Sequence, residues 1–189
     1  MTALISVYNK NNIVNFAKGL ELLGIELVST GGTYDLLSTS GLNVKNILDL
    51  TKYKTPIDSI IKTLYPEIYA GISVNRDDDK QMNQLNSASI DIIDIVIVNL
   101  FPFNSTINHY NSYTSIFETI DIGGPTILRS AAKNYKNIIV VSDPNDYDDI
   151  LQELKSTNDI SLQKREYLAQ KVFKMTSDYD KMIYDYLLF

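Results

Sequence analysis

The segment "STGGT" (residues 29–33) has the composition of a turn that binds a phosphate group. Its glycines let backbone N–H groups approach an anion closely, and a helix that starts there adds partial positive charge. Thr30 and Thr33 can donate hydroxyl hydrogen bonds, and Lys10, at the end of the turn "SVYNK" (6–10), can supply a full charge. Taken alone, the same segment is also compatible with a plain tight connection between a strand and a helix.

A third segment, "DIGGP" (121–125), again combines polar residues with glycines, and it precedes a segment with helical spacing that carries Lys133. The other two turns directly follow apolar runs that we predict to be strands. Strands that alternate with helical segments predict a parallel sheet with helices on both faces. Ligands of such sheets bind at the carboxyl ends of the strands, so we expect the three turns to meet there. The predicted strands are residues 3–8, 25–30, 43–48, 93–100 and 137–142.

The composition is that of an acidic globular protein. The chain has 189 residues, a formal net charge of −6, a pI of about 4.7 and no cysteine. Nucleic-acid binding usually requires a basic face, which this balance disfavours. No apolar run reaches the roughly 18 residues of a membrane span, and the N-terminus lacks the pattern of a signal peptide. These features predict a cytoplasmic protein that binds neither nucleic acid nor membranes.

The length suits one domain with a sizeable core. We expect residues 1–189 to form a single domain, with a sheet-and-helix core over about 1–150 and closing C-terminal helices over about 151–189. The acidic run Asp77–Asp79 is interpreted as a solvated face, and no metal site is predicted. Helical segments are predicted to begin near Asn12, Thr33, Ser112, Thr126, Asp143 and Leu162.

Longer stretches around these motifs resemble the N-terminal IMP cyclohydrolase domain of the bifunctional purine-biosynthesis enzymes, whose other half is AICAR transformylase. The order and spacing of the stretches hold over nearly the whole chain, and "DIGGPTILRSAAKN" is the most specific of them. The tail "AQKVFKMTSDYDKMIYDYL" also resembles the helices that close that domain. The other matching stretches are "ALISVYNK", "ELVSTGGTYDLL", "KTLYP", "VNLFPF" and "DPNDYD".

The resemblance implies a fold, a reaction and partners. The fold is the methylglyoxal-synthase-like three-layer α/β sandwich with a mainly parallel central sheet. The reaction closes the purine ring of formyl-AICAR to give IMP: the carboxamide nitrogen attacks the formyl carbon, and water leaves. No metal or organic cofactor is required. The ligand is therefore a purine ribonucleotide, and the partners implied are a second copy in a homodimer and, in a full-length protein, a fused AICAR transformylase domain.

The same resemblance implies roles for individual residues. Lys133 corresponds to the proton donor and acceptor, and Lys62 to a second cation near the reacting groups. Asp121 and the backbone of Ile122 correspond to groups that fix the base and the carboxamide. Without the resemblance, Lys133 and Lys62 are equally compatible with surface lysines, and Asp121 with a helix cap. The residues implied to contact the phosphate and the rest of the nucleotide are Tyr8, Asn9, Lys10, Thr30, Gly31, Gly32, Thr33, Thr63 and Asn99.

Several positions around these residues depart from the family pattern. The family reads "GRVKTLHP" where this chain has "SIIKTLYP", "NLYPF" where it has "NLFPF", and "SVSDK" where it has "SVYNK". The arginine replaced by Ile60 would add charge beside an anion, and the tyrosine replaced by Phe101 would add a phenol. A histidine of the family pattern is also replaced at Tyr69. The departures with the clearest chemical consequence are Tyr8, Ser59, Ile60, Tyr65, Tyr69 and Phe101.

Two hypotheses follow, and a third is disfavoured. The first is an active IMP cyclohydrolase, because Lys62, Asp121 and Lys133 are all retained. The second is a weakly active or inactive domain that binds a phosphorylated ligand or serves as a scaffold, as Ile60 and Phe101 suggest. Methylglyoxal synthase itself shares the implied fold, but "DIGGP" followed by "AAKN" argues against that activity.

Overall fold

The central layer of the protein is a five-stranded sheet in which every pairing is parallel. The strand order is β3-β2-β1-β4-β5 in a computed structural model that describes residues 1–51, 64–103 and 116–187. A strand occurs in each of the five apolar runs predicted to form one. The strands are β1 (Thr2–Val7), β2 (Glu26–Ser29), β3 (Val44–Asn46), β4 (Ile95–Asn99) and β5 (Ile139–Val141).

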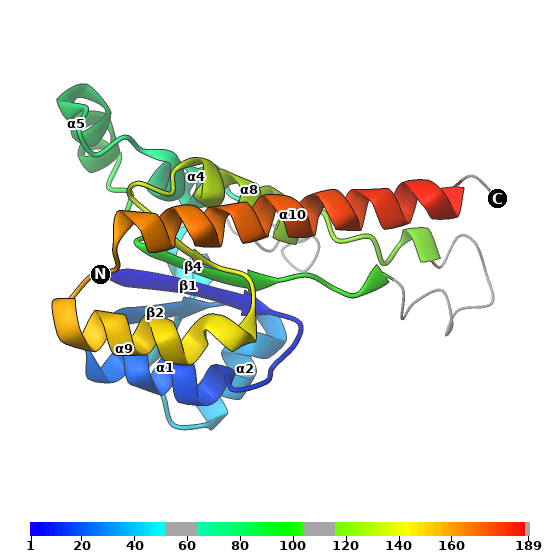
Figure 1. The fold of residues 1–189 in the computed structure, drawn as a ribbon. Coiled ribbons are helices and arrows are strands. Elements are labelled where there is room, and N and C mark those ends of the chain that lie inside the picture. Colours follow the sequence, from blue (N-terminus) through cyan, green and yellow to red (C-terminus); the bar gives the residue numbers. More distant parts are fainter. Residues whose placement is uncertain (52–63, 104–115, 188–189) are drawn as a thin grey trace.

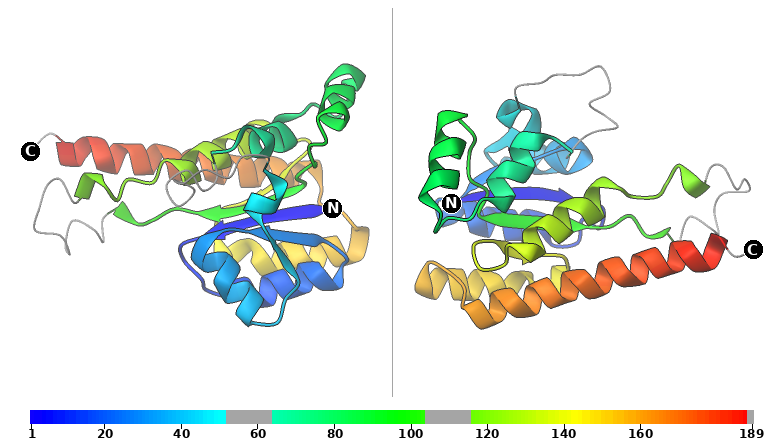
Figure 2. Two further views of the ribbon diagram at one scale, coloured as in Figure 1. Left: turned by 180° about the vertical axis from the view of Figure 1, so that it is seen from behind. Right: turned by 90° about the horizontal axis from the view of Figure 1, so that it is seen from above.

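Helices cover both faces of this sheet and form the two outer layers (Figures 1 and 2). One layer contains α1 (Ile13–Leu22), α2 (Gly31–Thr39) and α9 (Tyr147–Thr157). The other layer contains α4 (Pro66–Ser73), α8 (Gly123–Lys133) and α10 (Leu162–Leu187). The predicted three-layer sandwich with a parallel central sheet is thus confirmed. The remaining described helices are α5 (Asp79–Ser87) and two short 3₁₀ turns, Ile47–Leu50 and Pro144–Asp146.

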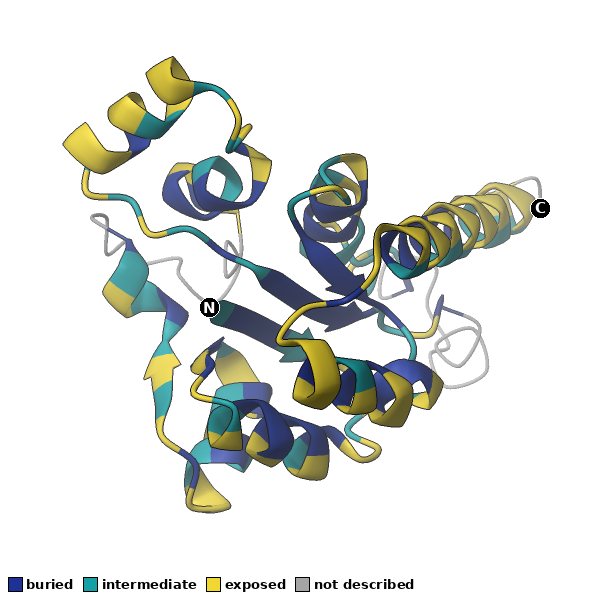
Figure 3. Cartoon of the chain, turned by 60° about the vertical axis from the view of Figure 1, so that its left-hand side comes forward, coloured by how far each residue is buried: buried dark blue, intermediate teal, exposed yellow. Residues whose placement is uncertain are grey.

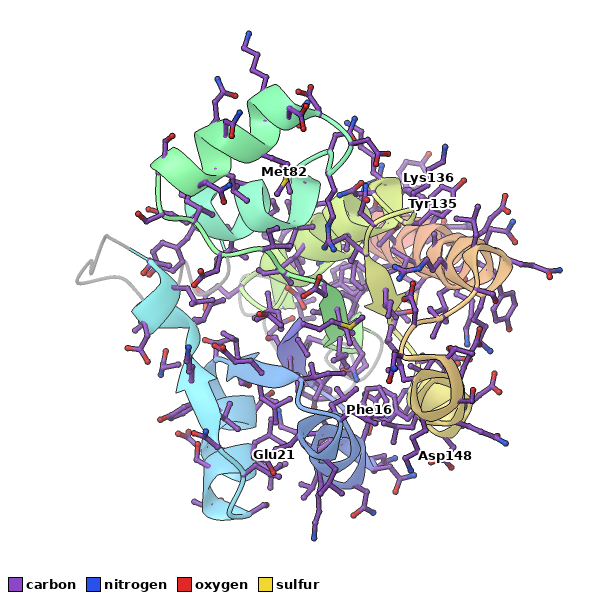
Figure 4. All side chains as sticks on the ribbon, turned by 90° about the vertical axis from the view of Figure 1, so that its left-hand side faces the viewer. Phe16, Glu21, Met82, Tyr135, Lys136 and Asp148 are labelled. Carbon is purple, nitrogen blue, oxygen red and sulfur yellow. The ribbon has the colours of Figure 1, made fainter. Side chains whose placement is uncertain are left out.

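The main core lies between the sheet and its two helical layers. All five residues of β4 are buried, as are Ala3, Leu4 and Ile5 of β1 (Figure 3). A parallel strand covered on both faces must be apolar on both faces, which is why these runs do not alternate with polar residues. Phe16 of α1, labelled in Figure 4, stacks on Tyr147 of α9 with ring centroids 4.2 Å apart, and this contact joins the two helices of one layer.

Helix boundaries differ from the prediction at two ends that bear on function. Helix α2 begins at Gly31 rather than Thr33, because Thr30 is extended (φ −140°) and Gly31 adopts a positive φ of 53° that glycine tolerates. Helix α8 begins at Gly123 rather than Thr126. Both helices therefore start inside their glycine-rich turns, and these turns supply first-turn N–H groups. Most of the helix predicted over 112–120 lies outside the described residues.

Other predicted features have simple local explanations. Asn12 precedes α1 but makes no side-chain capping hydrogen bond. Asp78, inside the acidic run, accepts hydrogen bonds from the backbone N–H groups of Lys80 and Gln81 and so caps α5. The C-terminal tail forms one helix of 26 residues. Among residues 1–51, 64–103 and 116–187, no helix is long and apolar enough to cross a bilayer.

Candidate functional site

A cavity of about 830 Å³ opens at the carboxyl ends of β1 and β4. It lies between the N-terminus of α2 and the N-terminus of α8, and its size falls in the usual range for small-molecule sites. All three predicted turns contribute to its wall, which confirms that they meet at this edge of the sheet. The residues of these turns that line the cavity are Ser6, Val7, Tyr8, Lys10, Thr30, Gly31, Gly32, Thr33, Asp121, Ile122, Gly123 and Gly124.

The first turn of α2 forms one end of the cavity, which we call the anion end (Gly31, Gly32, Thr30 and Lys10). The first N–H groups of a helix have no intrahelical acceptor, and no side chain caps this helix. A Cβ added to Gly31 or Gly32 would meet no atom within 4 Å, so their backbone is open to the cavity. Thr30 makes no side-chain cap bond. These donors and the helix dipole together suit a bound anion.

Lys10 gives the anion end its charge. Its Nζ donates a hydrogen bond to Thr33 Oγ1 at 2.7 Å and another to the carbonyl oxygen of Val7. Both acceptors are neutral, and no ion pair found among the described residues includes Lys10. Partial burial lowers the pKa of Lys10 from its ordinary value. The ammonium group is thus positioned beside the α2 N-terminus, and no carboxylate of the described residues neutralises it.

Two residues predicted to contact a nucleotide also hold the turns together. Thr33 is buried; its hydroxyl donates to the carbonyl oxygen of Val7 at 3.0 Å and accepts from the Val7 N–H at 3.2 Å. Asn99 accepts hydrogen bonds from the N–H groups of Tyr8 and Asn9 at 2.7 and 2.8 Å. Because the single hydroxyl hydrogen of Thr33 and the amides of Tyr8 and Asn9 are already used, none of them is available to an anion.

The opposite end of the cavity, which we call the acidic end (Glu118 to Gly124), is built around Asp121. Asp121 Oδ1 accepts the Gly124 N–H at 2.8 Å, as a helix cap does, and the Asp121 N–H donates to the hydroxyl of Tyr179 at 2.9 Å. A Cβ on Gly124 would lie 2.6 Å from Asp121 Oδ2, so any other residue here would force the Asp121 side chain to shift. Glu118 also lines this end. The two carboxylates repel a phosphate, which favours one orientation for a ligand with a single anionic group.

An aromatic pair lines the cavity between these two ends. Tyr8 and Phe101 follow neighbouring strands and meet edge to face, with ring centroids 4.7 Å apart. Tyr8 is 52% exposed, whereas Phe101 is partly buried. Both positions depart from the family pattern. Because the two rings are in contact, the two replacements change the same part of the cavity wall. Phe101 offers no hydroxyl to the cavity, and Tyr8 offers one.

Some predicted site residues are not among the described residues that line the cavity. Lys62 and Thr63 lie outside the described residues, as do Ser59 and Ile60. Asn9 is exposed and absent from the described lining, and its Oδ1 accepts from the Asn11 N–H at 2.9 Å.

Lys133 is also absent from the described lining, because it ends α8 while the cavity lies at the start of that helix. Helix α8 has 11 residues, and at 1.5 Å per residue its two ends lie about 15 Å apart. Lys133 is exposed, and Figure 4, seen from the amino ends of the strands, shows the adjacent Tyr135 and Lys136 on that side of the molecule. The expectation that Lys133 shares a cavity with the three turns is therefore not met within one chain.

The other two departures that the structure describes belong to the core. Tyr65 is buried and precedes α4. Tyr69 packs against the main core, and burial raises its pKa to about 12. Neither residue lines the cavity, so these replacements change the packing of α4 rather than the wall of the site.

The sequence reasoning missed several residues that line the acidic end or support it. Glu118, Thr119 and Ile120 line the cavity just before "DIGGP" but belong to no recognisable motif. Tyr179 lies on α10 and reaches Asp121 across 58 positions of sequence. Its helical spacing from the buried residues Val172 and Thr176 indicates a core-facing side chain, but spacing alone does not show where its hydroxyl binds.

Comparison with protein families places this fold and site in a class. The model of the MGS-like domain matches residues 12–126, which is more than half of the chain. The chain therefore belongs to the MGS-like domain family. A second model, that of the AICARFT/IMPCHase bienzyme, matches residues 131–188.

Individual relatives are more specific. The chain is 48% identical over 185 residues to the bifunctional purine biosynthesis protein PurH of Caldicellulosiruptor saccharolyticus, and 45% identical over 186 residues to that of Bacillus subtilis. These matches cover 97% and 98% of the chain but only 36% of each relative. A solved structure described as that of ForH is 33% identical, with a TM-score of 0.86 over 97% of this chain and 96% of that one. The resemblance to the N-terminal domain of the bifunctional enzymes is thus confirmed.

Proposed function

We propose that this chain is an IMP cyclohydrolase module, which closes the ring of formyl-AICAR to IMP in purine biosynthesis. The observation that carries the proposal is a single cavity with an anion end at α2 and an acidic end at α8. A ribonucleotide has one anionic group and a neutral base at its other end, which matches this polarity. The PurH names of the relatives and the AICARFT/IMPCHase match support the same activity.

The reaction makes modest demands on the protein because both reacting groups belong to one molecule. The carboxamide nitrogen attacks the formyl carbon to give a tetrahedral carbinolamine, and water then leaves to complete the ring. Holding the substrate in a folded conformer in which these groups nearly touch removes entropy from the barrier in advance. Binding the phosphate through the Gly31 and Gly32 amides and Lys10, and the base through the Asp121 turn, provides two such fixed points.

The acidic end fits the role of fixing the carboxamide. A carboxylate can accept a hydrogen bond from the carboxamide N–H₂ group, and this bond both orients the nitrogen and increases its nucleophilicity. Asp121 is held for this purpose by its own bond to the Gly124 N–H. Ile122, an exposed residue, lines the cavity beside it. Lys62, which lies outside the described residues, remains the predicted cation for the formyl oxygen.

We further propose that Lys133 acts as the proton donor and acceptor only in an assembly of two copies. Within one chain Lys133 is exposed at the far end of α8 from the cavity. A second copy can bring this lysine to a neighbouring cavity without any change in the fold. The homodimer and the cytoplasmic location remain predictions, as does the fused transformylase domain in a full-length protein.

The test follows ring closure of formyl-AICAR spectroscopically with the purified chain, its Lys133→Ala variant and, as a matched control, Lys136→Ala. Lys136 is a second exposed lysine only three positions away. We expect turnover by the unaltered chain, a loss of at least about 100-fold in Lys133→Ala, as for removal of a general acid–base group, and little change in Lys136→Ala. Equal turnover in the two variants contradicts the role of Lys133.

A mixed assembly separates action within a chain from action between chains. Lys133→Ala and Asp121→Asn chains are co-expressed with different tags, and the mixed dimers are purified. One cavity of each mixed dimer then combines an intact Asp121 with a Lys133 from the other copy, so we expect activity to return. Mixed dimers as inactive as the parent variants contradict action between copies. No turnover by the unaltered chain leaves the binding or scaffold alternative, which the enzymatic relatives currently make the weaker one.

A further inference from the structure

The C-terminal helix α10 supports the wall of the cavity from behind. Its C-terminal part runs past the carboxyl ends of the strands, beyond the main core (Figures 1 and 2). There it forms a second, smaller hydrophobic cluster with the segments that precede the acidic end. The buried members of this cluster are Phe103, Ile116 and Tyr179, and its partly buried members are Leu100, Ile120, Met182, Ile183 and Tyr186.

Tyr179 connects this cluster to the acidic end through one hydrogen bond. Its side chain is 3% exposed, and its ring meets that of Phe103 edge to face with centroids 6.4 Å apart. Its hydroxyl accepts the Asp121 N–H at 2.9 Å. Asp121 is thus held at two points, because its carboxylate accepts the Gly124 N–H from α8. The backbone position of Asp121 depends on α10, and the direction of its side chain depends on α8.

Packing alone does not explain why residue 179 is a tyrosine rather than a phenylalanine. A phenylalanine would fill the same space in an apolar cluster, whereas a buried hydroxyl costs free energy unless it forms a hydrogen bond. Burial is the largest effect on the Tyr179 hydroxyl and raises its pKa, whereas the hydrogen bond from the Asp121 N–H lowers the pKa by less. The hydroxyl therefore stays neutral at physiological pH. A neutral oxygen accepts a backbone N–H without adding a charge beside the Asp121 carboxylate.

We propose that Tyr179 is a positioning residue for the acidic end of the cavity. Its hydroxyl fixes the Asp121 backbone, and through it the Asp121 carboxylate and the Ile122 backbone that face the base of a bound nucleotide. This inference rests on the proposed function for the identity of the ligand. It makes α10 a part of the site, although none of the described lining residues belongs to that helix.

The two ends of the cavity allow a selective test with Tyr179→Phe. We expect the affinity for IMP, measured by calorimetry, to fall about 3- to 10-fold, which corresponds to one hydrogen bond. Affinity for ribose 5-phosphate, which occupies only the anion end, should change less than about twofold. Backbone hydrogen exchange at Asp121 should accelerate. Tyr184→Phe is the matched control, because Tyr184 is a 60% exposed tyrosine on the same helix.

Several outcomes overturn the inference. Equal weakening of IMP and ribose 5-phosphate indicates a general structural defect rather than positioning. Unchanged IMP affinity, or unchanged exchange at Asp121, shows that the hydroxyl does not hold the turn. If the unaltered chain binds ribose 5-phosphate but neither binds IMP nor closes the ring, the proposed function fails. Exchange at Asp121 in Tyr179→Phe still decides in that case whether α10 fixes this end of the cavity.

Discussion

The two ends of the cavity are built in different ways. At the anion end, Thr33 forms hydrogen bonds with Val7 and with Lys10, which lie 26 and 23 positions away in the sequence. The N–H groups that can donate to an anion belong to the backbone of one glycine-rich turn. At the acidic end, Asp121 depends on Tyr179, 58 positions further along the chain, and on a separate hydrophobic cluster. Both ends therefore use contacts between distant segments, but the anion end presents backbone N–H groups of one turn, whereas the acidic end presents a side chain whose place depends on another helix.

This difference determines how each end responds to substitution. Backbone N–H groups and a helix dipole do not depend on side-chain identity, provided that nothing blocks the approach of the anion. The acidic end depends on particular side chains and on a close approach at Gly124, where a Cβ would displace the Asp121 carboxylate or the end of Leu100. Substitutions of the side chains that line the cavity should thus alter selectivity for the base more readily than they alter binding of the phosphate.

Among the substitutions that should affect the two ends of the cavity differently, Asp121→Asn is expected to have the largest effect. Asparagine keeps the oxygen that accepts the Gly124 N–H, so α8 should remain capped. Loss of the charge weakens a charge-assisted hydrogen bond to the carboxamide, and we expect ring closure to slow about 10- to 100-fold. Affinity for ribose 5-phosphate should not fall. Asp148→Asn, on the exposed face of α9, is the control (Figure 4), and a parallel loss of both quantities would contradict a division of roles between the ends.

A pair of glycine substitutions should distinguish the ends by stability. In Gly124→Ala the new Cβ would lie 2.6 Å from Asp121 Oδ2 and 2.8 Å from Leu100 Cδ2, so we expect a loss of about 1–3 kcal/mol in unfolding free energy. In Gly32→Ala the new methyl meets nothing within 4 Å and should leave stability unchanged or slightly raised. The methyl occupies the space of the anion, so phosphate affinity should fall instead. Thermal unfolding and calorimetry measure both quantities, and equal destabilisation of the two variants would refute the distinction.

The smallest effect is a shift in the pH dependence of anion binding. The pKa of Lys10 is lowered by burial from its ordinary value of 10.5, so Lys10 loses its proton at a lower pH than a free lysine does. Affinity for ribose 5-phosphate should therefore decline as pH rises through this lowered pKa. Lys10→Arg should retain affinity to higher pH, because a guanidinium stays charged. Calorimetric titrations from neutral to alkaline pH test this, and identical profiles for the two proteins would exclude Lys10 as the charge of the anion end.

The same lowered pKa has a consequence for folding. Between the folded pKa and 10.5 the unfolded chain binds more protons at this lysine than the folded chain does, so the contribution of Lys10 to stability rises with pH in that window. A bound phosphate opposes this trend, because a neighbouring anion raises the pKa of an ammonium group. Stability and anion affinity should thus move in opposite directions as Lys10 loses its proton.

The sequence alone determined the strands, the sheet class and the meeting of three turns at one edge. Each follows from local chemistry: apolar runs such as 95–99 require burial on both faces, and glycines and hydroxyls at 29–33 suit a strand-to-helix turn. Only the tertiary structure decided which polar side-chain groups remain available to a ligand. Thr33 and Asn99 have the right chemistry for a ligand, but the Thr33 hydroxyl hydrogen is donated to Val7, and Asn99 Oδ1 accepts the N–H groups of Tyr8 and Asn9.

The tertiary structure also decided the places of Lys133 and Tyr179. The family resemblance implied that Lys133 belongs to the site, but the rise of α8 carries it to the opposite edge of the sheet. Tyr179 belongs to a tail that the resemblance linked only to closing helices, yet the packing of α10 against α8 brings its hydroxyl to Asp121. Local patterns encode which backbone groups a turn exposes, whereas side-chain partners depend on the packing of elements that are far apart in the chain.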